Sequence, residues 1–208
     1  MQIAYNENLD GGGSASIEDA VSATKMFLGD QRPKDVLEMF SGPGFWGFGL
    51  LDADIGIDSL LLADKYGIAE DSINQTTKNN DLKNVHFCLT DCFNRIPRSW
   101  GKFDLIVGNP PHFCIDPFNK HYTDPRKYKD TNWSIHNRFF REAQYHLRPN
   151  GKIILMENIW GSSPETFKDV TEKNGLQITR AFTSEVFENE LYYMEIVKKD
   201  TKKGWHIL

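Results

Sequence analysis

The sequence predicts an α/β domain with a doubly wound, mostly parallel sheet. Short apolar runs alternate with segments of helical periodicity from residue 36 to residue 173, which is the pattern of strands joined by crossover helices. The final two apolar runs, Gln177–Phe182 and Leu191–Lys198, leave no room for a crossover helix, so they should pair as an antiparallel hairpin at one sheet edge. With 208 residues, the chain is long enough for one well-buried domain and too short for two ordinary ones.

The other elements follow in a regular order along the chain. Asp10–Ser14 is too rich in glycine to hold structure alone, and it precedes a helix expected over Ile17–Leu28 with Ser16 as its cap. The strands expected before the hairpin, which bring the sheet to seven, are Val36–Met39, Leu60–Ala63, Val85–Leu89, Leu105–Val107 and Ile153–Met156. The helices expected between them are Phe45–Leu51, Glu70–Asn79, Ser134–Leu147 and Pro164–Lys173.

Charge, cysteine content and hydropathy narrow the class of protein. The chain has 24 basic and 29 acidic residues, and its net charge of −5 gives no general attraction to nucleic acid phosphates. Cys88, Cys92 and Cys114 lack the spacing of a metal site, so we expect reduced thiols and no metal. No apolar stretch approaches the roughly 20 residues of a membrane span, and the N-terminus lacks the regions of a signal peptide. We therefore expect a cytoplasmic protein with no membrane partner.

A glycine-rich turn follows the first expected strand. Gly42, Gly44 and Gly47 have the spacing GxGxxG, which lets the backbone turn sharply and brings helix N–H groups close to a ligand. Alone, this pattern fits a dinucleotide pyrophosphate, an adenosine with an amino-acid tail, or a tight turn without a ligand. Glu38 puts a carboxylate at the end of the strand, where it would repel a pyrophosphate and attract an ammonium group.

Two further carboxylates stand at the ends of the next two strands. Asp64 closes the second strand, where it can accept hydrogen bonds from both hydroxyls of a ribose, and this feature also fits NAD. Asp91 follows the third strand, where it can accept from an adenine amino group while Cys92 or Phe93 packs on the ring. Because ligands of open α/β sheets bind beyond the carboxyl ends of the strands, acids at three successive ends indicate a binding site.

The fourth strand stops in a rigid turn, Asn109-Pro110-Pro111-His112. Prolines donate no ladder hydrogen bonds and cannot extend a central strand, so the strand must end there. The Asn109 amide oxygen and the Pro110 carbonyl can accept both hydrogens of an NH₂ group and stabilise positive charge that develops on its nitrogen. His112 can take the departing proton, because an imidazole titrates near neutral pH. The alternative is that the turn only ends the strand.

Between about residue 36 and residue 198, these motifs resemble those of class I S-adenosylmethionine-dependent methyltransferases. Glu38–Gly47 resembles the first motif of that family, Asp64 its ribose-binding acid, and Asp91 its adenine-side acid. The resemblance implies a Rossmann-like fold with an antiparallel seventh strand and S-adenosylmethionine as the cofactor. The residues it implies for cofactor binding are Glu38, Phe40, Gly42, Gly44, Gly47, Asp64, Asp91 and Cys92.

The proline turn resembles the [D/N]-PP-[Y/F/W] motif of methyltransferases that act on amino and amide nitrogens. These include release-factor glutamine methyltransferases and the small-domain enzymes that methylate RNA guanine or adenine. The resemblance implies N-methylation, with Asn109, Pro110, Pro111 and His112 as catalytic residues. His112 stands where the family usually has Tyr, Phe or Trp, and Phe113 follows it, so either ring can stack on the acceptor. Residues 1–32 are expected to form a flexible N-terminal segment and a helix that cover the cofactor site, and residues 33–208 the methyltransferase catalytic domain.

The methyl acceptor remains open at this point. A protein side-chain amide or a small molecule comes first, and an RNA base follows because the net charge is negative. An NAD-dependent oxidoreductase would share the glycine turn and Asp64 but has no use for Asn109-Pro110-Pro111. A cofactor-binding partner subunit that has lost catalysis is a further alternative, which the unusual His112 keeps open.

Several residues after the proline turn are candidates for the acceptor side. A long connection carries basic side chains and tyrosines that suit an anionic acceptor or nucleotide bases, or else face solvent: Lys120, His121, Tyr122, Arg126, Lys127, Tyr128 and Lys129. His136, Arg138 and Arg141 on the next helix extend that surface or face water. Glu157, Asn158 and Trp160 follow the fifth strand, where Trp160 fits core packing equally well.

Overall fold

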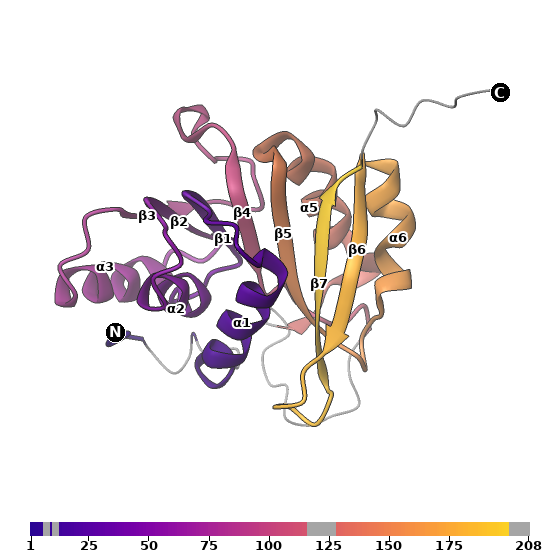
Figure 1. Ribbon diagram of the computed structural model, residues 1–208, viewed down its shortest axis with the longest axis horizontal. Coiled ribbons are helices and arrows are strands. Elements are labelled where there is room, and N and C mark those ends of the chain that lie inside the picture. Colours follow the sequence, from indigo (N-terminus) through magenta and orange to yellow (C-terminus); the bar gives the residue numbers. More distant parts are fainter. Residues whose placement is uncertain (6–8, 10–12, 116–127, 200–208) are drawn as a thin grey trace.

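The centre of the computed structural model is a seven-stranded sheet with the order β3-β2-β1-β4-β5-β7-β6 (Figure 1). The structure describes residues 1–5, 9, 13–115 and 128–199. The strands are β1 (Asp35–Met39), β2 (Ser59–Asp64), β3 (Val85–Leu89), β4 (Phe103–Gly108), β5 (Leu147–Asn158), β6 (Leu176–Thr183) and β7 (Leu191–Lys198). The pairs from β3 to β5 are parallel, whereas β7 runs antiparallel to both β5 and β6. The predicted fold class and its C-terminal hairpin are confirmed, with β7 inserted between β5 and the edge strand β6.

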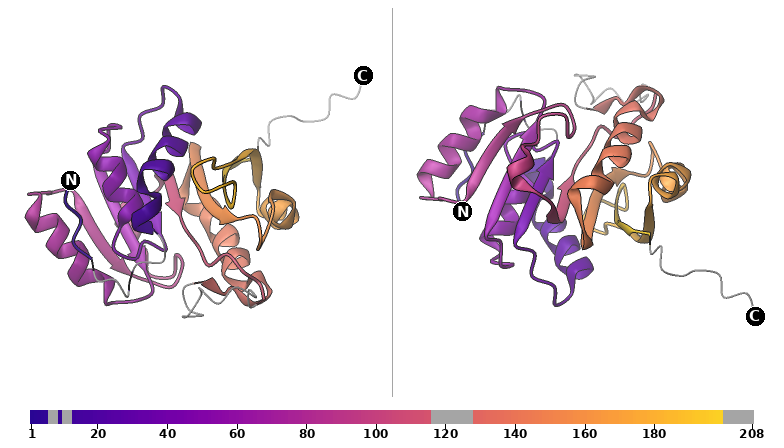
Figure 2. Two further views of the ribbon diagram at one scale, coloured as in Figure 1. Left: turned by 90° about the horizontal axis from the view of Figure 1, so that it is seen from below. Right: turned by 90° about the horizontal axis from the view of Figure 1, so that it is seen from above.

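Two layers of helices cover the sheet, and Figure 2 views them along the strands. The helices are α1 (Gly13–Leu28), α2 (Phe45–Asp52), α3 (Ala69–Asn79), α5 (Ser134–His146) and α6 (Pro164–Lys173), with the short 3-10 helices η2 (Arg98–Trp100) and η3 (Thr131–Trp133). Side chains of α1, α2 and α3 fill one apolar core with one face of the sheet, and those of α5 and α6 fill the other. Each face of the central strands is therefore buried, as expected for strands with continuous apolar runs.

The strand register brings the carboxyl ends of the parallel strands to one edge of the sheet. Met39 pairs with both Ala63 and Gly108, and Gly108 pairs with Leu155. The turn between β6 and β7 reaches the same edge, because Asn158 of β5 pairs with Leu191. All the motifs that follow β1, β2, β3, β4 and β5 in the sequence therefore meet along one side of the domain.

The N-terminal helix differs from the sequence prediction in where it begins. It starts at Gly13, so Ser16 lies inside the helix, buried, and donates its hydroxyl to the Gly13 carbonyl (3.2 Å) rather than capping the first turn. The Tyr193 hydroxyl donates to Asp19 (2.7 Å), which joins the helix to β7. Near the C-terminal end of α1, the Phe27 carbonyl accepts a hydrogen bond from the Lys152 ammonium at 2.6 Å. The helix is thus an integral layer of the domain.

Strand β5 is longer than its apolar run suggested. It runs from Leu147 to Asn158, and Leu147 already pairs with Phe103, with a register shift before the regular pairing resumes at Leu105. The early part contains Pro149 and Gly151, which hide the strand from a pattern based on apolar residues. Within the residues the structure describes, no helix is both long and apolar enough to span a bilayer.

Candidate active site

The glycine-rich turn between β1 and α2 has a left-handed backbone at two glycines. Gly42 has φ 49° and Gly44 has φ 86°, a region that other residues seldom adopt. A Cβ atom on Gly44 would lie 2.6 Å from Leu62 Cδ1 and 2.9 Å from Phe48 Cε2, whereas one on Gly42 would meet, among the described residues, only the Leu9 carbonyl, at 3.6 Å. Packing against the core therefore requires glycine at 44, whereas position 42 has ordinary van der Waals room for a Cβ and favours glycine through its left-handed backbone.

Phe40 is the unexpected member of this turn. It has φ 60°, which for a bulky side chain costs about 1–2 kcal/mol relative to an ordinary conformation. Its ring is half-buried and packs on Phe139 of α5, with ring centroids 5.7 Å apart. Such strain persists only where surrounding packing holds it, and it marks functional turns more often than ordinary ones. Nothing in the sequence pattern signals it.

Glu38 is buried beneath the turn and faces the start of α2. Its carboxyl oxygens accept the backbone N–H groups of Gly47 (2.7 Å) and Trp46 (3.3 Å). Burial raises the pKa of Glu38 to about 8, against the lowering effect of these hydrogen bonds, and the charge of Asp64 adds to the rise. Glu38 thus holds the helix start in place, and its predicted contact with a ligand ammonium group stays a prediction.

Asp64 links the end of β2 to the glycine turn. Its Oδ2 accepts the Gly42 N–H at 2.9 Å and its Oδ1 accepts the Tyr66 N–H at 2.8 Å. Burial raises the pKa of Asp64, partly offset by these two hydrogen bonds. Each carboxylate oxygen retains further acceptor capacity. Two adjacent buried carboxylates, each with a raised pKa, suit a ligand that brings hydroxyl donors and positive charge.

Asp91 lies at the same edge but already has a partner. The Arg138 guanidinium of α5 hydrogen-bonds to its carboxylate. Cys92 is buried with φ 51°, and burial raises the pKa of its thiol to about 11. Phe93 stacks on His146 of α5, with centroids 4.7 Å apart, so its ring serves the core. All three cysteines are free thiols, buried or half-buried, as expected.

The proline turn follows β4, and the side-chain amide of Asn109 lies at its start. The Asn109 Oδ1 atom is buried and has no hydrogen-bond partner among the described residues. Pro110 and Pro111 are buried beside it, and His112 is half-buried. Phe113 is buried at 5% exposure, so of the two candidate stacking rings the more accessible one is His112. A buried amide oxygen without a donor costs about 1–3 kcal/mol, which a ligand N–H can recover.

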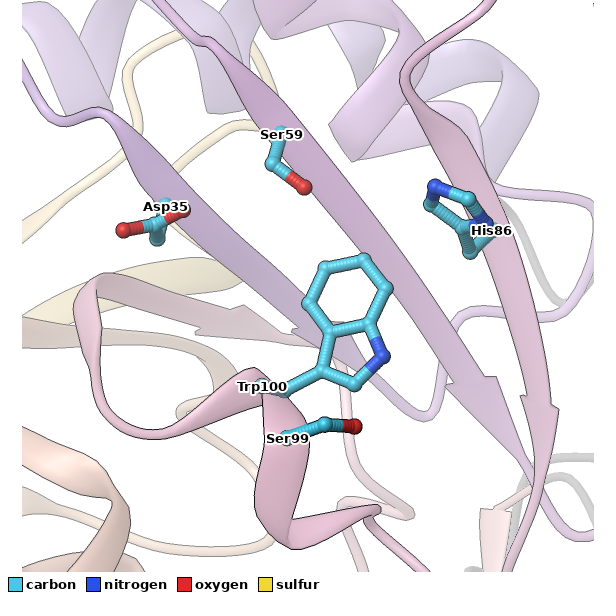
Figure 3. A pocket seen from close by; sticks show the side chains of 5 residues that line it. All are labelled: Asp35, Ser59, His86, Ser99 and Trp100. Carbon is cyan, nitrogen blue, oxygen red and sulfur yellow. The ribbon is translucent and has the colours of Figure 1, made fainter.

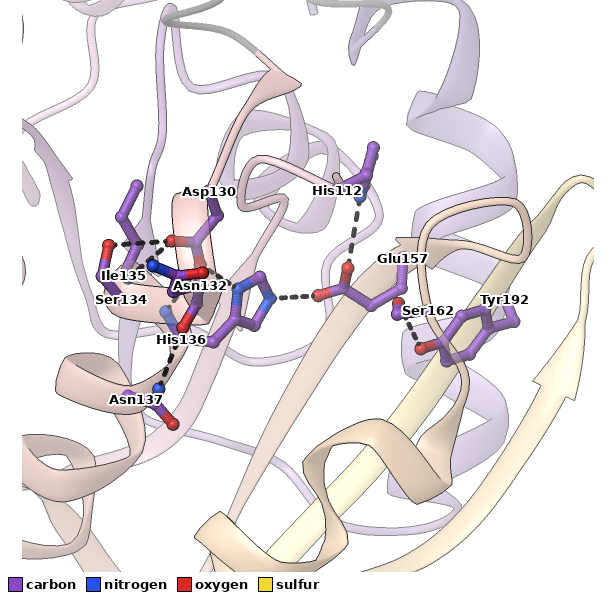
Figure 4. Close-up of polar contacts among 10 residues, drawn as sticks. All are labelled: His112, Asp130, Asn132, Ser134, Ile135, His136, Asn137, Glu157, Ser162 and Tyr192. Carbon is purple, nitrogen blue, oxygen red and sulfur yellow. Dashed lines mark hydrogen bonds and ion pairs between the residues drawn. The ribbon is translucent and has the colours of Figure 1, made fainter. Parts of the chain in front are cut away.

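A chain of buried ionisable side chains reaches His112 (Figure 4). His136 Nδ1 lies 2.7 Å from Asp130 Oδ2, and His136 Nε2 lies 2.8 Å from Glu157 Oε1. The other Glu157 oxygen, Oε2, lies 3.3 Å from His112 Nδ1. These residues come from the segment before η3, from α5, from the end of β5 and from the turn after β4, so they meet only in the folded chain. We call them the acid–histidine chain.

The charges of this acid–histidine chain follow from its contacts. Burial would lower the pKa of His136, but the Glu157 charge and hydrogen bonds to Asp130 and Glu157 raise it to about 9. Burial would raise the pKa of Glu157, but the His136 charge and hydrogen bonds from both histidines lower it. The pKa of Asp130 is lowered against burial by its hydrogen bonds with His136 and the Ile135 N–H. His136 is therefore an imidazolium between two carboxylates.

Among the acceptor-side predictions, that for His136 is wrong, and the core-packing alternative for Trp160 is excluded. His136 does not lie on a surface, because it is 1% exposed and its ring stacks on Phe167, 4.4 Å between centroids. The sequence contains a signal for this burial, because positions 136, 139, 140 and 143 recur at helical spacing. In the structure they form one face of α5, and all four residues are buried. Trp160 does not pack in the core, because it is 74% exposed beyond β5.

The remaining acceptor-side candidates divide between buried, exposed and undescribed positions. Arg138 is committed to Asp91, Arg141 is exposed, and the buried Asn158 accepts the Trp160 N–H at 2.9 Å through its side chain. Of the basic connection, Lys120, His121, Tyr122, Arg126 and Lys127 lie outside the described residues. Its role in acceptor binding stays a prediction.

A separate pocket of about 260 Å³ opens at the opposite edge of the sheet (Figure 3). Its lining includes Asp35 and Ser59, which begin β1 and β2, and Trp100, whose ring meets His86 edge-on with centroids 5.0 Å apart. Asp35 pairs with Arg148 at 2.6 Å. Because ligands of such sheets bind beyond the carboxyl ends of the strands, this pocket is not part of the candidate site.

Comparison with known proteins gives one family and many similar folds. The family model described as methyltransferase small domain matches residues 16–183. A search of curated proteins gives no match.

The similar solved structures include a ribosomal protein L11 methylase from Lactobacillus delbrueckii subsp. bulgaricus. It has a TM-score of 0.65 and 15% identity, and the alignment covers 95% of this chain and 82% of that one. The T. thermophilus 16S rRNA N2 G1207 methyltransferase (RsmC), in complex with AdoMet and guanosine, has a TM-score of 0.59 and 20% identity, covering 86% of this chain and 42% of that one. TrmN from Thermus thermophilus has a TM-score of 0.61 and 16% identity, and the alignment covers 89% of this chain and 53% of that one. The chain thus spans about half the length of the latter two proteins.

Proposed function

Because this chain belongs to the methyltransferase small domain family, we propose that it transfers the methyl group of S-adenosylmethionine to a nitrogen atom of its acceptor. Methyltransferase activity and the use of S-adenosylmethionine come with the family. What we propose is that the acceptor atom is a nitrogen, and which residues bind the cofactor and the acceptor. The observation that carries it is the buried Asn109 oxygen, which has no hydrogen-bond donor in the part of the chain that the structure describes.

The residues around the glycine turn fit the cofactor. Asp64 offers acceptor oxygens for ribose hydroxyls, and Gly42 leaves the space above the turn free of a side chain. A cationic ligand also favours ionisation of Glu38, whose pKa of about 8 reflects burial beside another carboxylate. A dinucleotide pyrophosphate would add negative charge to the same place. The site therefore supports S-adenosylmethionine over NAD.

The N-terminal segment is proposed to cover this cofactor site. The Leu9 carbonyl lies 3.6 Å from where a Cβ on Gly42 would stand, so the chain passes close above the turn. Residues 1–5 are held on α3 through the Ala4 N–H to Thr76 (2.9 Å), and Gly13 begins α1 against the Phe45 ring. These contacts place the described N-terminal residues next to α3, the glycine turn and the start of α2.

The proline turn is proposed to hold the acceptor nitrogen by accepting its hydrogens. Asn109 Oδ1 and the Pro110 carbonyl would receive the two hydrogens of an NH₂ group, which turns the nitrogen lone pair away from them. When bound, the cofactor supplies a strongly electrophilic methyl group, so the protein contributes mainly by positioning. These two oxygens also stabilise the positive charge that develops on the nitrogen.

An acceptor with an NH₂ group suits this arrangement, which includes a side-chain amide, a small-molecule amine or amide, and the exocyclic amine of an RNA base. The solved structure of the 16S rRNA N2 G1207 methyltransferase contains guanosine, whose exocyclic amine is of this kind. A hydroxyl or thiol acceptor has only one hydrogen and would leave either Asn109 Oδ1 or the Pro110 carbonyl without a donor, so nitrogen is favoured.

The test is transfer of a tritiated methyl group from S-adenosylmethionine into fractionated protein, RNA and metabolite pools. We expect one pool to be labelled at nitrogen by the wild-type protein and not by Asn109→Ala. Calorimetry with S-adenosylhomocysteine and NAD provides the matching binding control. Labelling of an oxygen or sulfur atom would contradict the proposal, and cofactor binding without labelling of any pool would favour a partner subunit without catalysis.

A further inference from the structure

We propose that Glu157, held by His136 and Asp130, positions His112 as the group that takes the proton released by the methyl acceptor. The inference rests on the proposed function, because it concerns the same site. It goes beyond that function by assigning roles to Glu157, His136 and Asp130, three buried residues that belong to neither the glycine turn nor the proline turn.

The hydrogen-bond pattern fixes where the protons of the acid–histidine chain lie. An ionised carboxylate only accepts, and both Glu157 oxygens face a ring nitrogen, Oε1 at 2.8 Å and Oε2 at 3.3 Å. The hydrogen between Glu157 and His112 therefore belongs to His112 Nδ1. In its neutral form, His112 then carries its lone pair on Nε2, the nitrogen that can take a proton.

The charges of the chain favour that proton transfer. Asp130 and Glu157 carry two negative charges and His136 one positive charge, so the buried part has a net charge of −1. A second proton, on His112, brings the chain to neutrality in surroundings where a net charge is costly. Tyr192 of β7 adds only a neutral hydroxyl that contacts Ser162 at 2.9 Å, and α6 contributes the apolar Phe167.

A purely structural role explains the position of these residues less well. Buried ion pairs are often no more stabilising than apolar residues of the same volume. Strongly coupled ionisable groups that meet at a ligand edge are typical of functional sites. The same sheet holds another buried carboxylate, Glu195, which pairs with Lys152 and Arg180 at 2.7 Å each, and these two cations also donate to the Phe27 carbonyl. The Glu195 cluster joins α1, β5, β6 and β7 to one another. Glu195→Gln is therefore a matched control for Glu157→Gln.

The methyl-transfer step releases one proton. The acceptor nitrogen forms a bond to the methyl carbon, and the sulfur keeps the electron pair of the broken carbon–sulfur bond as a neutral thioether. The nitrogen then loses one proton to His112 Nε2, while the hydrogen on Nδ1 stays on His112 and faces Glu157. The proton leaves His112 for solvent, to which the half-buried ring has access.

The first measurement requires no acceptor. In ¹⁵N-histidine NMR spectra of the wild-type protein at about pH 8, with the His112 signals identified by their loss in His112→Ala, we expect the hydrogen of the neutral ring on Nδ1. We expect both ring nitrogens of His136 to be protonated in the same spectra. A His112 hydrogen on Nε2, the usual form of a free imidazole, would overturn the proposal.

The second measurement uses single-turnover methyl transfer from tritiated S-adenosylmethionine to the extract fraction that the wild-type protein labels. We expect Glu157→Gln to lower the rate at least about 10-fold, since general bases contribute about 10²–10⁴. Its S-adenosylhomocysteine affinity should stay within about twofold, and the acid limb of its pH–rate profile should move to lower pH. Glu195→Gln should retain the wild-type profile, with loss of stability as its main effect.

The two proposals fail in different ways. A wild-type rate and profile in Glu157→Gln would overturn the positioning role while leaving N-methylation intact. If no fraction is labelled by the wild-type protein, the proposed function falls, and the NMR spectra still decide whether Glu157 positions His112.

Discussion

Replacing Gly44 by alanine should destabilise the protein more than the same change at Gly101, and the difference can be derived from the structure. Both glycines have a left-handed backbone, φ 86° and 66°, so both variants incur about 1–2 kcal/mol of backbone strain. A Cβ at Gly101 meets nothing within 4 Å, whereas one at Gly44 lies 2.6 Å from Leu62 Cδ1 and 2.9 Å from Phe48 Cε2. Overpacking of this kind costs about 1–3 kcal/mol more.

The assay is urea unfolding of both variants beside the wild-type protein, followed by calorimetry with S-adenosylhomocysteine. Gly101→Ala should lower the free energy of unfolding by about 1–2 kcal/mol and leave binding unchanged. Gly44→Ala should lower it by about 2–5 kcal/mol and weaken binding as the turn shifts away from Leu62. Equal losses of stability would refute the conclusion that core packing dictates glycine at 44. Equal losses would also mean that glycine at position 44 serves only to leave room for the cofactor.

Two further predictions concern buried ionisable groups. Asp64→Ala should weaken S-adenosylhomocysteine affinity by about 1.5–3 kcal/mol, which is roughly 10- to 150-fold. Asp58→Ala, at an exposed carboxylate, is the control. An unchanged dissociation constant in Asp64→Ala would place the ribose elsewhere. The His136 pKa of about 9 lies above its ordinary value of 6.5, so its stabilising contribution should be complete below about pH 6.5 and lost as pH rises through 9. The unfolding free energies of the wild type and His136→Asn should therefore converge by about 3 kcal/mol between pH 6.5 and 9.5, and a constant gap would show that His136 is neutral in the folded protein.

The strands and helices were predictable because their signals are local. Apolar runs and helical periodicity lie within single segments, and the prolines after β4 end that strand wherever the chain folds. The errors arose where local rules compete. Gly13 begins α1 although Ser16 is the better capping residue, and Pro149 hides the first half of β5.

The candidate site was predictable only as far as strand ends determine it. Glu38, Asp64 and Asn109 follow strands whose carboxyl ends must share an edge, so their proximity follows from the fold class. The acid–histidine chain joins residues 112, 130, 136 and 157 through contacts that depend on how α5 packs against β5, and no sequence pattern links them. The role of Arg138 as the partner of Asp91 was missed for the same reason.

The most direct test of nitrogen methylation is the single-turnover rate of Asn109→Ala on the acceptor fraction that the wild-type protein labels. Asn109 Oδ1 is buried and receives no hydrogen bond from any described residue, and its contact with the acceptor nitrogen should strengthen as positive charge develops. We expect S-adenosylmethionine affinity within a few-fold of the wild type and a methyl-transfer rate lower by roughly 10²-fold or more. A variant that transfers the methyl group at full rate would mean that Asn-Pro-Pro only ends β4, and the assignment of a nitrogen acceptor would fall with it.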